Sequence, residues 1–358
     1  MIACLYGHAF GPFVEPIVGD LHAAAAAAGH ELGALTIETA VNRPLLCAAV
    51  RRLYVLPFDP PEPGPGEPGA DTPGAHFTLV RALFPRAEIF TSFAAQDLCW
   101  DKLATQERLR DRGLPVPDTL VSTDPQECRD FVARHGFALL KERFSCAGQG
   151  HIVVWLEDGR LVGDGGSHQY AMDLVAEGER HLDGERLVYP GPFYLQRLVA
   201  DVGPRGVTPG QMLRAYVVDN HVPFWTERYR DRYERPADWI INVGRGAKYR
   251  FVQNVSEEAK KIALRCVEVA GLRVGVVDLI RTGSQGPYVL EIDTDGYHMV
   301  IDRQFKQIPD YRDFFDLDRY IADALFVEPE IPAPRRREEP PERPAPPRER
   351  PPLRRPRR

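Results

Sequence analysis

The sequence predicts a mixed α/β protein built from two or three packed subdomains. At 358 residues, the chain is longer than one ordinary hydrophobic core supports. Short strand-like runs alternate with helical segments in its first part, and this alternation is typical of a small α/β lobe. The composition, 44% hydrophobic and 27% charged, is that of a globular protein.

Cysteine spacing and hydropathy indicate a cytoplasmic protein. Six cysteines lie far apart with no CxxC pair, which is typical of reduced thiols rather than of a disulfide frame or a zinc site. No apolar run approaches the length of a membrane span, and Met1–Phe10 lacks the basic start of a signal peptide. We therefore expect no membrane partner.

Charge is unevenly distributed along the chain. Residues 331–358 contain ten arginines and four glutamates, which is a net charge of +6. Since the whole chain has a net charge of −6, residues 1–330 carry a net charge of −12. An acidic body argues against nucleic-acid binding by the folded part. The Pro/Arg/Glu-rich tail is predicted to be disordered. Whether this tail binds nucleic acid or an acidic partner, or only solubilises the chain, stays open.

The first hundred residues contain strand and helix signals separated by a long polar loop. Ile2–Tyr6 and Leu53–Leu56 are predicted strands, and the alanine-rich run Leu21–Ala28 is a predicted helix ended by Gly29. The Pro/Gly-rich stretch Pro57–Gly74 is expected to be a surface loop. No G-x-G-x-x-G motif follows the first strand, so the sequence gives no support for a Rossmann dinucleotide site.

Capping signals define two helices in the middle of the chain. Asp101–Arg112 is a predicted polar helix that stops at Gly113. Asp124-Pro125 begins the next, which stops at Gly136. Phe137–Lys141 then has the pattern of a buried strand ending in a lysine.

The last third predicts a helix, a hairpin and a final helix. Ser256 caps a helix that Gly271 closes. Val274–Ile280 and Tyr288–Ile292 are predicted strands joined by a turn-rich loop. The final helix is expected over Leu317–Phe326.

The hairpin carries three carboxylates that could meet at one point. Asp278 lies inside an apolar strand, where an unpaired carboxylate is costly to bury. Glu291 and Asp293 are two residues apart and so project to one face of the partner strand. Oxygen-only ligands favour Mg²⁺ or Mn²⁺ over zinc. From this pattern alone, three carboxylates facing water at strand ends are an equal alternative.

Two lysines and a glycine-rich turn form the second candidate site. Lys102 begins a helix, and Lys141 ends a strand just ahead of Gly148-Gln149-Gly150. Glycines let backbone N–H groups approach phosphate oxygens, and a nearby lysine neutralises them. Each lysine alone is more often a solvated surface charge. Cys146 in this turn is interpreted as a small loop residue rather than a nucleophile.

Together these segments resemble the ATP-grasp superfamily, and within it the RimK-type and glutathione-synthetase-like ligases. The resemblance runs from about Asp97 to Phe326. Its most specific part is Asp101–Ala104 leading to Gly113–Pro117, which looks like the segment that opens the family's ATP-binding region.

The resemblance implies an ATP-grasp fold of α/β and α+β parts. An N-terminal α/β lobe would cover residues 1–96, and the ATP-grasp domain residues 97–327. Within that domain, a small α+β lid would cover about 120–200 and precede a C-terminal α+β lobe. ATP would lie between the last two, and residues 328–358 would form the disordered tail.

The resemblance also implies roles for individual residues. Lys102 and Lys141 would contact phosphates beneath a mobile glycine loop, and the hinge segment 196–199 would receive adenine through backbone groups. The three carboxylates would share one or two Mg²⁺ or Mn²⁺ ions with no protein cation between them, and Arg214 would clamp the transferred phosphate. The implied nucleotide-binding residues are Lys102, Lys141, Gly148, Gln149, Gly150, Gln196, Arg197, Leu198 and Val199, and the implied metal ligands are Asp278, Glu291 and Asp293.

The chain departs from the family around the nucleotide and acceptor. Arg197 stands where the family carries an acidic residue, and Met212-Leu213-Arg214 keeps the arginine of Asp-x-Arg but not the acid. Asp293 replaces a common asparagine, and Thr294-Asp295-Gly296 lacks the usual proline. Asn242 and Gly244-Arg245-Gly246 resemble the family's polar loop near the γ-phosphate.

The resemblance implies an ADP-forming ligase that activates a carboxylate as an acyl-phosphate and joins it to an amine. Small molecules or peptides would supply both groups. A kinase on the same fold and a non-catalytic nucleotide-binding protein are the two alternatives. The identity of the acid and the amine stays open, and so does the oligomeric state, a homodimer included.

Overall fold

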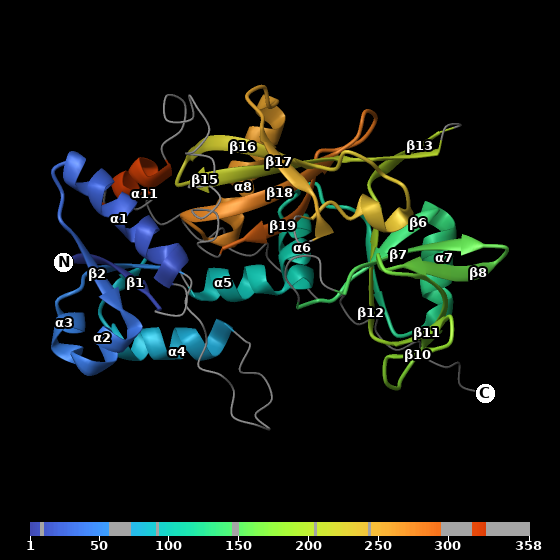
Figure 1. Cartoon of the computed structure of the whole chain (residues 1–358), viewed down its shortest axis with the longest axis horizontal. Helices are drawn as coiled ribbons and strands as arrows, with labels where there is room; N and C mark the ends of the chain where they lie inside the picture. The colour runs from blue at the N-terminus through green and yellow to red at the C-terminus, as the bar shows by residue number, and fades with distance from the viewer. Residues whose placement is uncertain are drawn as a thin grey trace, which may run out of the picture. The chain divides into compact units, whose positions relative to one another are not determined.

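The computed structural model describes residues 1–7, 11–56, 73–90, 93–144, 150–203, 206–242, 245–294 and 317–326. These residues contribute to one compact unit that ends at Phe326. Their strands form a four-stranded, an eight-stranded, a two-stranded and a five-stranded sheet (Figure 1). Among the helices described, none is long and apolar enough to cross a membrane.

The N-terminal sheet is parallel and has the order β2-β1-β3-β4. The predicted strand over Ile2–Tyr6 is confirmed, and the second predicted strand is shifted by one residue. The alanine-rich helix is longer than expected, because its predicted part is only the second half of α1. The strands are β1 (Ile2–Tyr6), β2 (Leu32–Thr36), β3 (Arg52–Val55) and β4 (Glu88–Ile89), and the helices are α1 (Gly11–Ala27), α2 (Ile37–Asn42), α3 (Pro44–Ala48) and α4 (Pro73–Leu83).

One prediction about this region needs correction. Residues 57–72 of the predicted loop Pro57–Gly74 lie outside the described residues, but Pro73 and Gly74 are the first two residues of α4. Proline is compatible with the first turn of a helix, because the N–H that it lacks would have no helical partner there. The predicted disordered tail and Gly148-Gln149 also lie outside the described residues.

The eight-stranded sheet has the order β10-β11-β9-β8-β7-β6-β12-β5. Helix α7 (Pro125–His135) packs on it through Cys128, Phe131 and Val132. Both predicted caps of this helix are confirmed: the Asp124 carboxylate accepts from the N–H of Gln126 at 2.8 Å, and Gly136 ends the helix. The strands are β5 (Thr119–Ser122), β6 (Phe137–Leu140), β7 (Ile152–Glu157), β8 (Arg160–Asp164), β9 (Gln169–Val175), β10 (His181–Asp183), β11 (Arg186–Pro190) and β12 (Phe193–Arg197).

The five-stranded sheet is antiparallel and has the order β17-β16-β15-β18-β19. Apolar residues on one of its faces share a core with helices α5 (Phe93–Trp100), α6 (Lys102–Asp111) and α8 (Glu257–Ala270). Ser256 and Gly271 cap α8 as predicted, and the predicted hairpin is β18 with β19. The strands are β15 (Gln211–Val218), β16 (His221–Tyr229), β17 (Lys248–Phe251), β18 (Val274–Arg281) and β19 (Tyr288–Asp293). In the sequence, a small hairpin of β13 (Ala200–Gly203) and β14 (Gly206–Pro209) follows the last strand of the eight-stranded sheet. The short 3₁₀ helix η2 (Pro236–Trp239) lies between β16 and β17.

Helix α11 (Leu317–Phe326), predicted with these same bounds, closes a second core. It lies beside α1 in Figure 1, red next to blue, and its apolar side chains pack with those of α1 and of the five-stranded sheet. Tyr216 and Val276 of that sheet face this core, and a buried guanidinium N–H of Arg52 donates to the carbonyl of Leu325. The N-terminal sheet and the five-stranded sheet therefore share a hydrophobic core that the last described helix completes.

We expect deletion of residues 330–358 to leave the unfolding temperature within about 2 °C of the full chain, because α11 already closes the core. Truncation at residue 316 should instead cost roughly 5 kcal/mol or more, since it removes the fully buried Leu317, Ile321 and Leu325. Differential scanning calorimetry of the three chains measures both effects. Equal losses in the two truncated chains would contradict the assignment of α11 as the closing element.

Candidate functional site

Polar side chains form a row across one face of the five-stranded sheet. Arg214 on β15 is the register partner of Asp278 on β18, and Asp278 is that of Glu291 on β19. Directly opposed residues project to the same face, and Asp293, two residues beyond Glu291, projects there as well. The three predicted carboxylates therefore share one face, as strand alternation predicted.

Asp278 is compensated by two arginines. Its carboxylate accepts from Arg214 Nε at 2.7 Å and Nη2 at 3.0 Å, and Arg228 Nη1 lies 3.2 Å away. Arg214 Nη2 also lies 3.6 Å from Asp293 Oδ2. Burial alone would raise the pKa of Asp278, which is 1% exposed, but the two guanidiniums hold that pKa below its usual value.

The expectation that no protein cation lies between the carboxylates is therefore wrong. A carboxylate in the middle of a sheet must be paired when it is buried, and arginine supplies a planar fork that matches it. Within the described ranges, no three His, Cys, Asp or Glu side chains are arranged as a metal site. The carboxylates of Glu291 and Asp293 are the partly exposed possible metal ligands on this face, since their side chains are 39% and 31% exposed.

Lys102 reaches the same row from helix α6. The Asp101 carboxylate caps this helix by accepting from the N–H groups of Leu103 and Ala104, both at 3.1 Å; the sequence predicted the helix but not this cap. The cap places Lys102 in the first turn, where its Nζ lies 3.6 Å from Glu291 Oε1. The side chain is buried, so this lysine is not a solvated surface charge.

Lys141 follows β6 and begins a chain of side-chain hydrogen bonds. Its Nζ donates to Gln196 Oε1 at 2.7 Å, and Gln196 Nε2 donates to Gln106 Oε1 at 3.0 Å. Gln106 in turn donates to the carbonyl of Leu290 on β19 at 3.0 Å. Burial lowers the pKa of Lys141 to about 8; Glu291 opposes that change and Lys102 reinforces it. The chain of amides ties the eight-stranded sheet to the strand that carries Glu291.

The strands that carry these side chains are similar to a known domain family. A RimK-like ATP-grasp domain model matches residues 207–307, which include β15, β18 and β19. The ATP-grasp ligase PsnB complexed with a minimal precursor aligns with a TM-score of 0.56 and 18% identity, covering 90% of this chain and 97% of that one. The chain therefore has the ATP-grasp fold, and its residues 207–307 resemble the RimK-like ATP-grasp domain.

Other solved structures support the same fold at low sequence identity. D-alanine–D-alanine ligase from Bacillus anthracis aligns with a TM-score of 0.53 and 11% identity over 90% of this chain and 97% of its own. Macrocyclase MdnC bound with its precursor peptide, from Microcystis aeruginosa MRC, gives a TM-score of 0.53 and 14% identity over 91% and 99%. The predicted ATP-grasp fold and the resemblance to the superfamily are confirmed.

The curated relatives match a smaller part of the chain. A probable alpha-L-glutamate ligase of Klebsiella pneumoniae (strain 342) is 28% identical over 193 residues, which are 54% of this chain and 55% of that protein. A probable alpha-L-glutamate ligase of Shewanella halifaxensis (strain HAW-EB4) is 27% identical over 194 residues, 54% of this chain and 36% of its own. The chain thus spans about half the length of the Klebsiella relative.

The hinge segment 196–199 of this chain divides its side chains between two sides. Gln196 is buried and faces Lys141, whereas Arg197, the next residue of β12, projects to the opposite side. There Arg197 hydrogen-bonds Gln285, and its guanidinium lies 5.0 Å from the ring centroid of Tyr288. The N–H of Leu198 donates to the carbonyl of Phe137, and the carbonyl of Val199 accepts from Gly210. The side chain of Arg197 therefore points away from the two lysines.

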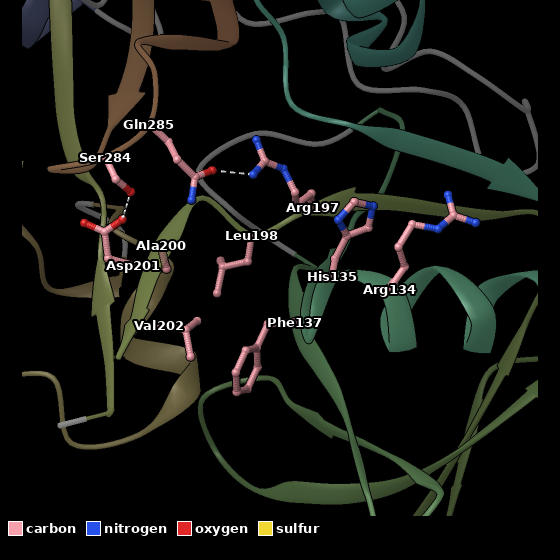
Figure 2. Close-up of a pocket in the computed structure, with 10 residues that line it drawn as sticks. All are labelled: Arg134, His135, Phe137, Arg197, Leu198, Ala200, Asp201, Val202, Ser284 and Gln285. Atoms are coloured by element: carbon pink, nitrogen blue, oxygen red, sulfur yellow. Dashed lines mark hydrogen bonds between the residues drawn. The ribbon is translucent and has the colours of Figure 1, made fainter. Parts of the chain in front are cut away.

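A pocket of about 470 Å³ lies on that opposite side and was not predicted from the sequence. Figure 2 shows Arg134, His135 and Arg197 along one side of it and Asp201 with Ser284 across from them. Its lining combines residues from three separate segments, 134–137, 197–202 and 284–285, and no sequence spacing connects them. We call it the hinge pocket; its lining residues are Arg134, His135, Phe137, Arg197, Leu198, Ala200, Asp201, Val202, Ser284 and Gln285.

The polar loop of the resemblance contacts the eight-stranded sheet. Gly244 lies outside the described residues, but Arg245 donates from Nη2 to the carbonyl of His151 at 2.9 Å and from Nη1 to that of Gly165 at 3.1 Å. Nearby, the fully buried carboxylate of Asp164 on β8 accepts from Arg235 at 2.7 and 2.8 Å. Two arginines from the segment between β16 and β17 thus hold the start of β7 and the end of β8.

Other residues of the site also follow from local physics. The described end of the glycine turn, Gly150, has φ +70°, and a Cβ there would meet Glu142 Cγ at 2.3 Å. Only glycine fits that backbone without rearrangement. Arg228 and Gln106 were not predicted from the sequence. The alternation of β16 contained a weak signal for Arg228, because it places Thr226 and Arg228 on one face.

We expect Lys141→Met to weaken ADP binding about tenfold to a hundredfold, because a phosphate loses a charged donor. In the unsubstituted chain, a lysine pKa of about 8 means that its charge is lost as the pH rises through that value. ADP binding should therefore take up a proton and weaken between about pH 7.5 and about pH 9. Isothermal titration calorimetry in two buffers of different ionisation enthalpy measures both quantities.

Lys260→Met is the matched control, since Lys260 pairs with Glu257 on the exposed side of α8. It should leave ADP affinity and proton uptake unchanged. Proton uptake that persists in Lys141→Met would assign the titration to another group.

Proposed function

We propose that this ATP-grasp protein is an ADP-forming ligase that activates a carboxylate as an acyl-phosphate and joins it to an amine. The supporting observation is the meeting of Lys102, Lys141 and Arg214 with the Asp278, Glu291 and Asp293 carboxylates around one sheet face. The relatives named above as ligases support the same reaction class.

Lys102 and Lys141 would neutralise the nucleotide phosphates in this proposal. Both are buried, so their charges act with less screening by water than surface lysines have. The solved PsnB structure with Mg and ADP supports the same ligands in the family. We assign the adenine to the hinge segment 196–199, and the phosphates to the lysines and the glycine turn 148–150.

Glu291 and Asp293 would hold Mg²⁺ or Mn²⁺, which supplies positive charge to the phosphates when bound. Their carboxylate oxygens are the ligands that these ions prefer. Asp278 would join them only if its oxygens keep a lone pair free beside Arg214 and Arg228, which each carboxylate oxygen can do. The carboxylate oxygens of this face therefore fit a divalent ion. For the Asp278 carboxylate, that ion would compete with the guanidinium groups of Arg214 and Arg228.

Arg214 would contact the transferred phosphoryl group. Its Nε and Nη2 bonds to Asp278 fix the guanidinium plane at the sheet face. A fixed cation stabilises charge that develops in phosphoryl transfer without reorganising during the step. The substrate carboxylate would attack the γ-phosphate and release ADP, and the amine would then displace phosphate from the acyl carbon.

We also propose the domain limits that the resemblance implied. Residues 1–96 would be the N-terminal lobe, 97–327 the ATP-grasp domain with its lid at about 120–200, and 328–358 a tail outside it. The five described cysteines are buried free thiols, and this supports a cytoplasmic location.

The reaction class is tested by incubating the protein with Mg-ATP and pools of amino acids, peptides and small carboxylates while ADP is measured. Mass spectrometry of each hit decides between the alternatives. A product equal to acid plus amine less water supports the ligase, gain of a phosphate group supports a kinase, and ADP binding without turnover supports a non-catalytic protein.

We expect Glu291→Gln to abolish ADP release in that assay while the unfolding temperature stays close to that of the unsubstituted chain. The change keeps the side-chain volume and removes a metal-binding charge. Turnover that survives the substitution would remove Glu291 from the metal site, and calorimetry shows whether the variant is folded.

We propose further that a peptide carries one of the reacting groups. PsnB and MdnC were solved with precursor peptides, and this chain has the hinge pocket on the side of β12 opposite to Gln196 and Lys141. Arg134 at the end of α7 and Arg197 on β12 give one side of this pocket positive charge (Figure 2). Burial lowers the pKa of His135 beside them, so its ring is neutral there. Leu198, Ala200 and Val202 add apolar surface. That lining fits an acidic peptide segment with an apolar side chain.

Arg134→Glu should raise the KM for an acidic peptide substrate about fivefold and leave the KM for ATP unchanged, because it reverses one exposed charge of the pocket. Arg129→Glu on the same helix is the control, since Arg129 does not line the pocket. Equal increases of the peptide KM in the two variants would mean that the net charge of the protein, and not the hinge pocket, determines peptide binding.

A further inference from the structure

His151 is a buried side chain in the candidate site with no role in the function proposed so far. It is 9% exposed, and its Nε2 is buried with no hydrogen-bond partner among the described residues. It immediately precedes β7, whose pairing with β6 runs through Ile152 opposite Leu140. Continuing this register by one residue puts His151 opposite Lys141. The two side chains therefore share a face of the sheet.

The backbone of His151 is fixed although its ring is unpaired. The carbonyl accepts from Arg245 Nη2 at 2.9 Å, and the same guanidinium donates to Gly165. A buried polar atom without a partner costs free energy, and proteins usually supply such an atom with a hydrogen bond. An orphaned Nε2 beside a lysine at the end of a glycine turn therefore indicates a ligand that completes it.

The charges around His151 determine which ligand that is. Burial, followed by the positive charges of Lys141, Lys102 and Arg245, lowers the pKa of His151 to about 2. The imidazole is therefore neutral, and Nε2 can carry a proton to donate. Phosphate oxygens of a nucleotide are acceptors, and the two lysines attract them to the same place.

We propose that His151 donates a hydrogen bond from Nε2 to a phosphate oxygen of the bound nucleotide. A neutral donor adds a contact without a third positive charge beside Lys102 and Lys141, whose mutual repulsion already disfavours further cations. This inference rests on the proposed nucleotide site and adds to it a residue that the resemblance did not supply.

The test compares His151→Phe and His151→Gln with the unsubstituted chain, using ADP and adenosine as probes in calorimetric titrations. Phenylalanine keeps a ring but removes the donor, so ADP affinity should fall about tenfold or more while adenosine affinity is unchanged. Glutamine places an amide N–H near the position of Nε2 and should restore most of the loss. His168→Phe, at an exposed histidine of the same sheet region, should change neither affinity.

Thermal unfolding separates a binding role from a structural one. Removing an unpaired buried polar atom should leave the unfolding temperature of ligand-free His151→Phe unchanged or higher, whereas loss of a structural hydrogen bond would lower it. In histidine labelled with ¹⁵N, the His151 Nε2 resonance, assigned by its absence from His151→Gln, should report a protonated neutral ring and shift when ADP is added. An unshifted resonance, equal losses for ADP and adenosine, or no loss would each overturn the proposal.

The outcomes also separate this inference from the proposed ligase. If the unsubstituted chain binds ADP but forms no amide, the activity fails and the His151 result still decides the contact. If the unsubstituted chain forms the amide and His151→Phe binds ADP normally, only the His151 contact fails. If it binds no ADP, both fail.

Discussion

The charge of Asp278 is the constraint on which the site depends. A carboxylate that is 1% exposed in the middle of a sheet stays ionised only if cations replace the water that it has lost. Arg214 meets that requirement from β15, which pairs with β18, and Arg228 meets it from β16 on the far side of β15. Their guanidiniums are thereby held on the same face as Glu291. The pairing that makes burial of Asp278 tolerable also fixes the orientation of the arginine proposed to contact the transferred phosphate.

A second constraint links the two large sheets. Lys141 follows a strand of the eight-stranded sheet, and its ammonium group donates to Gln196. Gln196 donates to Gln106, and Gln106 donates to a backbone carbonyl of β19. Each amide in this chain donates and accepts, so no member is left unsatisfied at its centre. The lysine therefore stays close to the carboxylates of the five-stranded sheet without forming an ion pair with them. This arrangement leaves its ammonium group available to a phosphate at a modest cost.

Local signals in the sequence predicted much of this fold because their physics involves few residues. Asp124 and Ser256 cap helices as expected, and alternation placed Glu291 and Asp293 on one face. Features that require a third segment were missed. The cations beside Asp278 come from strands about fifty to sixty-five residues away, and the hinge pocket joins three segments. Their separation in sequence leaves no spacing to recognise.

The pairs in the free site indicate how Mg-nucleotide would be received. Lys102 lies 3.6 Å from Glu291, so each residue compensates the other before any ligand is present. On the proposed function, phosphates attract Lys102 while a divalent ion attracts Glu291. Either ligand alone would separate this pair and leave one charge poorly compensated. When nucleotide and metal bind together, the Lys102–Glu291 ion pair is replaced by a pair between Lys102 and a phosphate and a pair between Glu291 and the metal ion. The nucleotide and the metal should therefore each bind more tightly in the presence of the other, and the coupling arises from a pair that the free protein already holds.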